Sequence, residues 1–252
     1  VNDQDLAQIN QRYQGPDFKV PKGVILLSTT NAKVDKINNS KLAELDSKHF
    51  EYEGSIKGDF KEKDCPSPET LKLKVGAQVM LTQNDVGNEP RRWSNGTLAI
   101  IHELKPNSIS IKIKDEVFVL GKSRWDKIQF TVASDEIKRK VVATFSQYPL
   151  KLAWASTIHK SQGQTFEKVA IDLDRGSFAH GQTYVALSRA KSMEGIYLVR
   201  KIAYKDLIFD EKVFDFLGQD LEAKNMKQVT KKNEASEYAS NLPYDEDYNQ
   251  DS

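Results

Sequence analysis

An apolar run followed by polar residues marks an α/β unit near the start of the chain. Residues 24–27, Val-Ile-Leu-Leu, are typical of a buried parallel strand, and residues 28–31 carry side chains that cap helices. Apolar residues then recur at roughly helical spacing, at Val34, Ile37, Leu42 and Leu45. The pattern predicts a strand, a loop and a helix. Over residues 50–70 the periodicity is lost, and no element is predicted there.

From Leu71 the pattern changes to the alternation of apolar and polar positions that indicates half-buried strands. The alternating apolar positions are Val79, Leu81, Leu98, Ile100, Ile109, Ile111, Ile113, Val117 and Val119. Turn signals separate these runs, at Gly76, Asn95-Gly96, Pro106-Asn107 and Lys114-Asp115. Short strands at this spacing predict a small β-barrel or sandwich, which we place at about residues 65–147.

After Pro149 the α/β pattern returns. The predicted elements are a strand at 150–155, a strand at 169–173, a helix at 180–191 and a strand at 196–199. The β-rich block is therefore predicted to be inserted into one α/β domain, formed by residues 1–64 and 148–218. Residues 219–252 are polar with few aliphatic side chains, so we expect this tail to be disordered.

Composition narrows the class of protein only a little. A formal net charge of +1 excludes a global basic field, so any binding of nucleic acid must depend on local groups. The single cysteine, Cys65, excludes an internal disulfide and fits a reducing compartment. No apolar run is long enough to span a membrane, so we expect no membrane partner and a cytoplasmic protein, in a bacterial cytosol or nucleoid. We also expect a monomer. The chain opens on Val1 rather than Met, which hints at a fragment.

The first candidate site is residues 155–165, Ala-Ser-Thr-Ile-His-Lys-Ser-Gln-Gly-Gln-Thr. A loop that follows a parallel strand faces the ligand crevice of an α/β sheet. Groups suited to phosphate oxygens are two hydroxyls, an imidazole and an ammonium, at Ser156, Thr157, His159 and Lys160. Gly163 allows a ligand to approach the backbone closely. The alternative is a polar surface loop in which His159 is only solvated.

The second candidate site is residues 181–190, Gly-Gln-Thr-Tyr-Val-Ala-Leu-Ser-Arg-Ala. One face of the predicted helix carries Gln182, Val185, Ala186 and Arg189. That face can direct Arg189 into a cleft with Gln182 beside it. A planar, permanently charged guanidinium suits the stabilisation of charge on a transferring γ-phosphoryl group. The alternative is an ordinary amphipathic helix in which Arg189 pairs with a carboxylate.

Thr30 and Asn31 stand where a helix is predicted to begin after a buried strand. Free N–H groups at such a helix start attract anions, including a DNA phosphate. The alternative is simple helix capping, which these residue types perform in any protein.

Two further groups of residues are weaker candidates. Arg92 and Trp93, preceded by Arg91, combine charge with an aromatic face that can stack on a base or grip a phosphate. The alternative is the tip of a hairpin. Asp172 and Asp174 resemble a magnesium-binding strand only superficially, because no phosphate loop accompanies them, and we predict no metal ligand in this chain.

These motifs resemble, in order along the chain, those of superfamily-one type-B helicases, the branch of the RecD and Pif helicases. Residues 159–165 resemble the fifth motif, and Gln164-Thr165 matches the Pif branch better. Residues 184–190 resemble the sixth motif, and residues 27–38 resemble the region of the fourth. Residues 72–81 and 95–97 resemble the Src-homology-three-like (SH3-like) insert of Pif helicases. Many relatives have, at the position of Thr165, a glutamate that binds the ribose of the nucleotide. The resemblance therefore implies no ribose contact for this chain.

The resemblance implies a fold and an activity. The fold is an α/β, RecA-like (P-loop NTPase-type) parallel-sheet domain with an inserted SH3-like β-barrel. No GxxxxGK[ST] phosphate loop occurs in the 252 residues, so ATP and Mg²⁺ are expected to be held mainly by an N-terminal RecA-like domain outside this sequence. The chain would be the C-terminal motor domain of a 5′-to-3′ ATP-dependent DNA helicase, of a family associated with repair, recombination and telomere maintenance. It would bind single-stranded DNA and be inactive alone.

The resemblance also implies roles for individual residues. Arg189 is the expected catalytic arginine finger. The expected nucleotide-binding residues are Gln162, Gly163, Gln164, Thr165, Gln182 and Arg189. The expected nucleic-acid contacts are Thr30, Asn31, Arg92, Trp93, Ser156, Thr157, His159 and Lys160. Two alternatives stay open: a non-catalytic nucleic-acid-binding adaptor derived from a helicase, and the helicase part of a RecD-like or relaxase-like protein.

Overall fold

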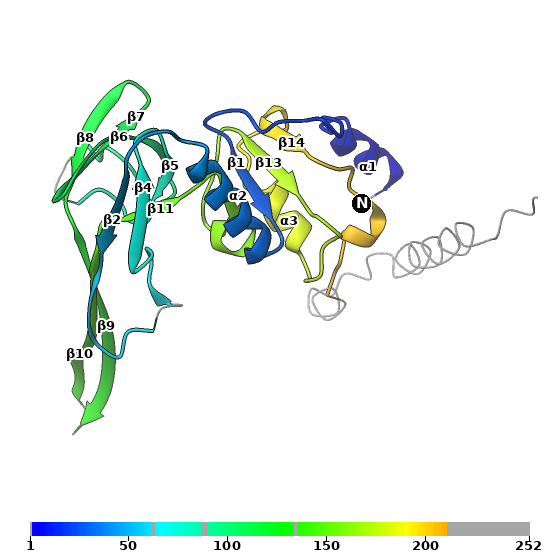
Figure 1. The fold of residues 1–252 in the computed structure, drawn as a ribbon. Coiled ribbons are helices and arrows are strands. Elements are labelled where there is room, and N and C mark those ends of the chain that lie inside the picture. Colours follow the sequence, from blue (N-terminus) through cyan, green and yellow to red (C-terminus); the bar gives the residue numbers. More distant parts are fainter. Residues whose placement is uncertain (1, 62–63, 87–89, 134–135, 211–252) are drawn as a thin grey trace, which may run out of the picture.

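The computed structural model describes residues 2–61, 64–86, 90–133 and 136–210, which form an α/β part beside a β-rich part (Figure 1). The predicted disordered tail, residues 219–252, lies outside the described residues. The chain begins in the α/β part, passes into the β-rich part and then returns, as the predicted insertion requires.

A four-stranded parallel sheet forms the centre of the α/β part. Its order is β12 (Ala155–Thr157), β1 (Ile25–Ser28), β13 (Val169–Asp172) and β14 (Ile196–Leu198). Every residue of β12, β1 and β13 is buried, which explains why β1 and β13 are mostly apolar rather than alternating. The strands predicted at 24–27, 169–173 and 196–199 and the α/β fold class are therefore confirmed.

The described residues form three α-helices, α1 (Asp3–Asn10), α2 (Asn31–Ala43) and α3 (Gln182–Leu187). Helix α2 buries Val34, Asn38 and Leu42, whose four-residue spacing places them on one face. The Asn38 side chain donates to the Ala155 carbonyl (3.0 Å) and accepts from the Ala155 N–H (2.9 Å). Asn38 thus supplies the outer edge of strand β12 with the hydrogen bonds that another strand would give.

Helix α3 is shorter than the predicted helix at 180–191. It begins after Gly181, which has the left-handed backbone conformation (φ 67°) that favours glycine. At its other end the chain turns and Ala190 pairs with Phe166 in an isolated parallel bridge. The predicted helix therefore exists, but a turn replaces its last residues.

The β-rich part contains three antiparallel sheets among the described residues. The largest has the order β11 (Leu150–Leu152), β5 (Gln78–Leu81), β6 (Leu98–Lys105), β7 (Ser108–Ile113) and β8 (Glu116–Leu120). The others are β2 (His49–Glu53) with β4 (Thr70–Lys74), and β3 (Ser55–Gly58) with β10 (Glu136–Gln147) and β9 (Ser123–Ala133). Strands predicted from alternation between residues 79 and 119 are confirmed, whereas an SH3-like barrel stays a prediction.

Strand pairing corrects two local expectations. Strand β3 and all of β2 except His49 lie within residues 50–70, where no element was predicted. They pair with β10 and β4, respectively. The strand predicted at 150–155 is wrong in its extent, because β11 (Leu150–Leu152) pairs with β5 of the β-rich part. The strand that joins the parallel sheet is β12, which runs from Ala155 to Thr157. Antiparallel pairing therefore extends on both sides of residues 65–147, although the domain boundaries themselves stay a prediction.

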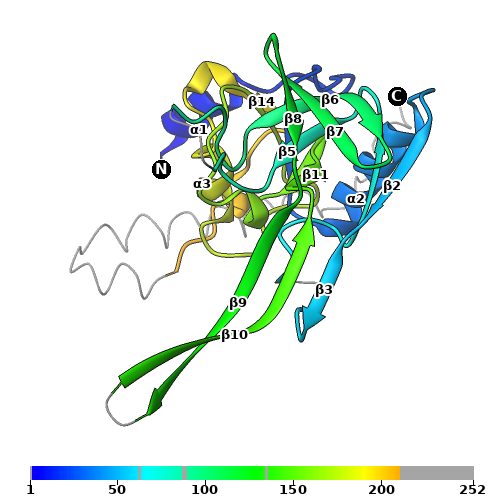
Figure 2. The same ribbon diagram turned by 90° about the vertical axis from the view of Figure 1, so that its left-hand side faces the viewer.

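A long hairpin of β9 and β10 projects from the body of the β-rich part (Figures 1 and 2). At its base Trp125 stacks on Phe145, with ring centroids 5.5 Å apart. Farther out the hairpin exposes Phe130 and Ile137, which are 65% and 73% exposed. Among the hairpin side chains that the structure describes, Phe145 at the base belongs to the core, whereas Phe130 and Ile137 do not.

Buried contacts hold the two parts together. Gln78 of β5 accepts a hydrogen bond from the Gly23 N–H (3.0 Å) and donates to the carbonyls of Val24 (3.2 Å) and Ala153 (2.8 Å). Met80, also in β5, is fully buried in the apolar core of the α/β part. The β-rich part is therefore packed on the α/β part at the point where β11 leads into β12.

Candidate nucleotide and nucleic-acid site

Three parallel strands of the sheet end in register. Ser28, the last residue of β1, is paired with Thr157 at the end of β12 and with Asp172 at the end of β13. The loops that follow these strands therefore leave the same edge of the sheet, which is where ligands bind in open α/β folds. The structure thus brings the candidate residues of 28–31 and 155–165 to one edge.

The 155–165 segment combines buried and exposed candidates. Ser156 and Thr157 are buried in β12, and the Thr157 hydroxyl accepts a hydrogen bond from the Lys160 N–H (3.3 Å). His159 and Lys160 lie in a 3-10 helix, His159–Ser161, and are exposed. The two exposed side chains are therefore available to a ligand, whereas Thr157 contributes mainly to the shape of the turn.

The candidate residues after this turn also include both exposed and buried side chains. Gln162, Gly163 and Thr165 are exposed, and Gly163 has a left-handed backbone (φ 76°) that the turn requires. The Gln164 side chain is buried beneath Gly96 of the β-rich part, where an added Cβ would lie only 3.0 Å from Gln164 Cγ. Gly96 also has a left-handed backbone (φ 91°), so close approach and conformation both demand glycine.

Thr30 and Asn31 are exposed at the start of α2, as the sequence predicts. Thr30 occupies the N-cap position, but its side chain makes no capping hydrogen bond. The capping alternative therefore does not account for its hydroxyl. Thr30 lines a cavity of about 630 Å³ together with Lys33 and Lys36 of α2.

Arg189 joins the two motif segments. Its Nη1 donates to the carbonyls of Gln164 (2.9 Å) and Ser161 (3.3 Å), and its Nε donates to the carbonyl of Val185 (2.9 Å). Its Nη2 donates to the Ser188 hydroxyl (2.9 Å). These acceptors are neutral, and no described carboxylate is ion-paired with Arg189. The alternative of a salt bridge to a carboxylate does not hold within the described residues.

Two buried glutamines near these segments keep polar atoms without a hydrogen-bond partner among the described residues. Gln182 is 3% exposed, and its Oε1 accepts from the Phe178 N–H (3.1 Å), which leaves its Nε2 unpaired. Gln164 is 9% exposed and its Oε1 is unpaired. Because buried polar atoms are normally satisfied, these two amides indicate a polar ligand or water in the complete site.

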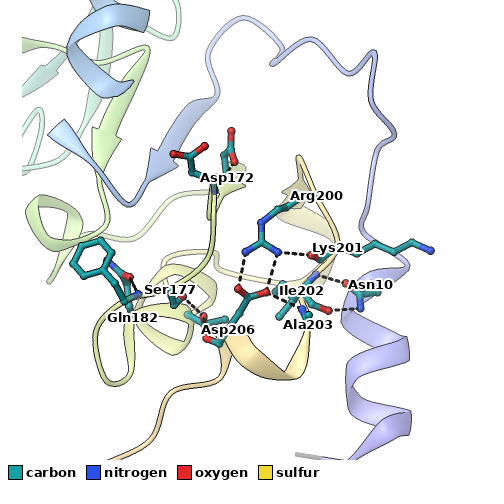
Figure 3. A network of polar contacts seen from close by, with 12 residues as sticks. Asn10, Asp172, Ser177, Gln182, Arg200, Lys201, Ile202, Ala203 and Asp206 are labelled. Atoms are coloured by element: carbon teal, nitrogen blue, oxygen red, sulfur yellow. Dashed lines mark hydrogen bonds and ion pairs between the residues drawn. The ribbon is translucent and has the colours of Figure 1, made fainter. Parts of the chain in front are cut away.

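Sequence patterns did not identify Asp206, a buried aspartate whose main-chain carbonyl binds the start of α3 (Figure 3). Asp206 is fully buried and forms two hydrogen bonds with Arg200, at 2.6 and 2.9 Å. Burial by itself raises the pKa of Asp206, but the bonds from Arg200 and the Ala203 N–H outweigh it and lower the pKa. The Thr183 hydroxyl of α3 donates to the Asp206 carbonyl. No local pattern marks this contact, because it joins residues 23 positions apart.

Asp172 and Asp174 are paired with a lysine. The Lys33 ammonium lies 2.7 Å from Asp172 and 3.2 Å from Asp174. Burial alone would lower the pKa of Lys33, but the two carboxylates outweigh it and raise the pKa. Across the described part of the chain, no three His, Cys, Asp or Glu side chains are grouped so that they could hold a metal ion.

Arg92 and Trp93 do not present the open aromatic face that the sequence suggests. Trp93 is 9% exposed and packs edge-on against Phe118, with ring centroids 5.6 Å apart. The Arg92 guanidinium lies 4.4 Å from the Trp93 ring centre and forms two hydrogen bonds with Asp85, at 2.7 and 2.8 Å. The ring is covered because it belongs to the apolar core of the β-rich part. A contact of Arg92 and Trp93 with nucleic acid stays a prediction.

A groove runs between α2 and the β-rich part. Its volume is about 630 Å³, and the candidates Ser156 and Lys160 line it together with Lys151 of β11. Lys151 lies outside every motif, so sequence patterns did not identify it. The groove therefore continues the candidate site from the edge of the sheet toward the insert.

Helices of the described residues are all too short or too polar to cross a membrane.

Comparison with known proteins agrees with the geometry. No protein-family model matches the chain. The ATP-dependent DNA helicase Pif1 of Bdellovibrio bacteriovorus is 33% identical over 219 residues, which cover 84% of this chain and 46% of the relative. A crystal structure of Bacteroides sp. Pif1 in complex with ADP-AlF4 matches with TM-score 0.73 and 33% identity, over 86% of this chain and 49% of that chain. One of Bacteroides Pif1 bound to ssDNA matches with TM-score 0.63 and 34% identity, over the same shares.

The parallel sheet with its two motif-bearing loops is thus a RecA-like α/β domain of a helicase. The chain belongs to the family of Pif1 ATP-dependent DNA helicases. It spans about half the length of the relatives that it matches.

Proposed function

We propose that the chain is the C-terminal motor domain of a 5′-to-3′ ATP-dependent DNA helicase. It binds single-stranded DNA at the carboxyl edge of its parallel sheet and directs Arg189 toward ATP held by an N-terminal RecA-like domain. One observation carries the proposal: Arg189 of the sixth-motif segment donates to the carbonyls of Ser161 and Gln164 in the fifth-motif loop. Through these hydrogen bonds, a movement of Arg189 on ATP binding or hydrolysis is transmitted to the loop that carries the DNA contacts.

The charge of Arg189 supports its role at the nucleotide. Its partners are carbonyls and a hydroxyl, which leave the positive charge uncompensated, and no described residue accepts the second Nη2 proton. A guanidinium of this kind stabilises the charge that develops on a transferring γ-phosphoryl group. The Gln164 Oε1 in the fifth-motif segment and the Gln182 Nε2 in the sixth-motif segment are also unpaired within the described residues, and each fits a polar ligand or water.

The other nucleotide residues in this proposal are Gln162, Gly163 and Thr165, which are exposed on the same loop. Bound ATP would supply the phosphoanhydride bond whose hydrolysis drives the motor, with Mg²⁺ held by the other domain. This chain's own residues orient the phosphates and stabilise charge.

The DNA contacts in this proposal are Thr30, Asn31, Ser156, His159 and Lys160. Their hydroxyl, amide, imidazole and ammonium groups suit phosphate oxygens, and such contacts are independent of base sequence. Thr157 shapes the loop, and Arg92 and Trp93 are not required. The pairing of β2 and β3 favours an inserted SH3-like barrel that begins near residue 49 rather than residue 65.

The test is ATP hydrolysis by the intact gene product that contains this chain. Arg189→Ala should reduce the DNA-stimulated rate by about 10³- to 10⁵-fold, the range for arginine fingers. Binding of a fluorescent single-stranded oligonucleotide should change little. Arg189→Lys, which keeps the charge but loses the planar fork, should not restore the rate. This chain alone should show no hydrolysis; robust turnover that survives Arg189→Ala would contradict the proposal.

The bonds of Arg189 to main-chain carbonyls also favour a second candidate, a non-catalytic nucleic-acid-binding adaptor in which this residue only braces the loop. In that case Arg189→Ala would lower the melting temperature of the chain and weaken binding of DNA, and the intact gene product would not hydrolyse ATP.

A further inference from the structure

Two lysines from different parts of the molecule meet in the groove between α2 and the β-rich part. Lys151 belongs to β11, which pairs with β5 of the β-rich part, whereas Lys160 belongs to the loop after β12 of the parallel sheet. Both line the groove of about 630 Å³. The lysine pair therefore lies across the junction of the two parts.

The positive charge of this pair is not neutralised within the described residues. The other ionisable groups that line the groove are Asp35, Cys65, Glu69 and Lys72. Lys72 is paired with Glu51, at 3.6 Å, and no described carboxylate is ion-paired with Lys151 or Lys160. Burial lowers the pKa of Lys151, and the charge of Lys160 lowers it further. A second cation near a half-buried ammonium is unfavourable, and an anion between them would remove that repulsion.

We propose that Lys151 and Lys160 together hold one phosphate group of single-stranded DNA in this groove. The inference rests on the proposed function and adds a contact from outside the helicase motifs. A backbone phosphate suits the site better than a protein carboxylate, because two further groups suited to phosphate oxygens lie beside the pair. Ser156 lines the same groove, and the exposed His159 precedes Lys160 in the same 3-10 helix. The bound phosphate would join the β-rich part to the α/β part through one ligand.

The first experiment measures affinity for a fluorescent oligo-dT as a function of salt concentration, by anisotropy, with the full chain. Lys151→Gln and Lys160→Gln should each weaken binding severalfold at low salt. Because both lysines hold the same phosphate, each substitution should also reduce the slope of log K against log[salt] by at most about 0.7, the value for one phosphate contact on a single strand. Lys168→Gln is the matched control, because Lys168 is exposed and lies outside the groove.

Folding does not confound this experiment. Lys151→Met removes a desolvated charge that faces a like charge, so its melting temperature should equal or exceed that of the unchanged chain. Weak DNA binding by a stable Lys151→Met variant would support the proposal. Unchanged affinity of both Lys151 variants, together with weakened binding by Lys160→Gln, would overturn it while leaving the proposed function intact. No binding by the unchanged chain at low salt would instead reject the proposed function.

A second experiment reports on the groove itself. In a chain with ¹³C-methylated lysines, NMR titration should show a pKa for Lys151 below the ordinary lysine value. Lys160→Gln should raise that pKa, because a repelling charge is lost, and oligo-dT should raise it as well. A Lys151 pKa that responds to neither change would show that the two ammonium groups do not share a ligand. Inorganic phosphate that raises the pKa and competes as well as oligo-dT, at equal phosphate concentration, would overturn the assignment to DNA.

Discussion

Arg189 and Arg92 are both held by several hydrogen bonds, but their partners differ in charge. Arg189 donates to the carbonyls of Ser161, Gln164 and Val185, which position the guanidinium without neutralising it. Arg92 forms a two-bond pair with Asp85 and covers the Trp93 ring. The hydrogen bond to Asp85 raises the pKa of Arg92. The first arginine therefore keeps a charge that it can offer to an anion, whereas the charge of the second is compensated within the protein.

The comparison shows that a motif residue must be judged by what its charge already contacts. Arginines in both regions attract attention in the sequence, because charge beside an aromatic or hydroxyl group suits nucleic acids and nucleotides. Only the tertiary contacts distinguish a positioned cation from a structural ion pair. The Arg189 region is accordingly the site of activity in our proposal, and the Arg92 region packs on the core of the β-rich part.

Trp93→Ala is the change with the largest expected effect on stability. Removing this buried ring should lower the free energy of unfolding by about 3–5 kcal/mol, measured by urea denaturation, because it leaves a cavity beside Phe118. Trp93→Phe keeps most of the packing and should lose less. Binding of single-stranded DNA by the folded fraction should be nearly unchanged. Loss of DNA affinity without loss of stability would instead assign Trp93 to the interface.

Asp206→Asn tests the Arg200–Asp206 pair, which holds the segment that binds the start of α3. The substitution leaves Arg200 without its carboxylate, and the expected loss of stability is about 2–3 kcal/mol. This loss is smaller than for a fully buried pair, because the Arg200 side chain is 27% exposed. The lowered pKa of Asp206 gives the sign of the pH dependence. Its stabilisation is present above the ordinary aspartate pKa and is lost as the pH falls through the lowered folded-state pKa.

Urea titrations at several pH values check this linkage. The unchanged chain should lose stability in acid more steeply than Asp206→Asn, which has no titrating group at this position. Parallel curves for the two proteins would show that the Arg200–Asp206 pair contributes little to folding.

Arg92→Gln should have the smallest effect. The Arg92 side chain is 37% exposed, so solvent screens its pair with Asp85, but the Asp85 side chain is only 2% exposed and would lose two hydrogen bonds. The expected loss of stability is therefore about 1–2 kcal/mol, less than for Asp206→Asn. The salt dependence of DNA binding should not change if the charge of Arg92 is compensated within the protein. If Arg92→Gln reduced the slope of log K against log[salt] by about 0.7, Arg92 would contact a phosphate. Arg92 and Arg189 would then not differ in whether their charge is available to an anion.

The sequence by itself determined three of the four parallel strands, β1, β13 and β14, as well as the helix after β1 and the place of the candidate loops. Apolar runs and alternation encode strands within a few neighbouring residues, so β1, β13 and β6–β8 could be predicted. The motif residues could be named because their hydroxyl, amide and guanidinium groups and their order along the chain are visible without a fold. Strands β2 and β3 were missed because their partners, β4 and β10, lie far along the chain.

Only the tertiary structure decided which groups meet. The Arg189 guanidinium reaches carbonyls 25 and 28 residues away, and Asp206 fixes a hydroxyl 23 residues away. Lys151 enters the groove because β11 pairs with β5 instead of continuing into the parallel sheet. The physical reason is that hydrogen bonds and close charge pairs act over a few ångströms. Which residues become partners therefore depends on how the chain folds back on itself and not on their spacing in the sequence.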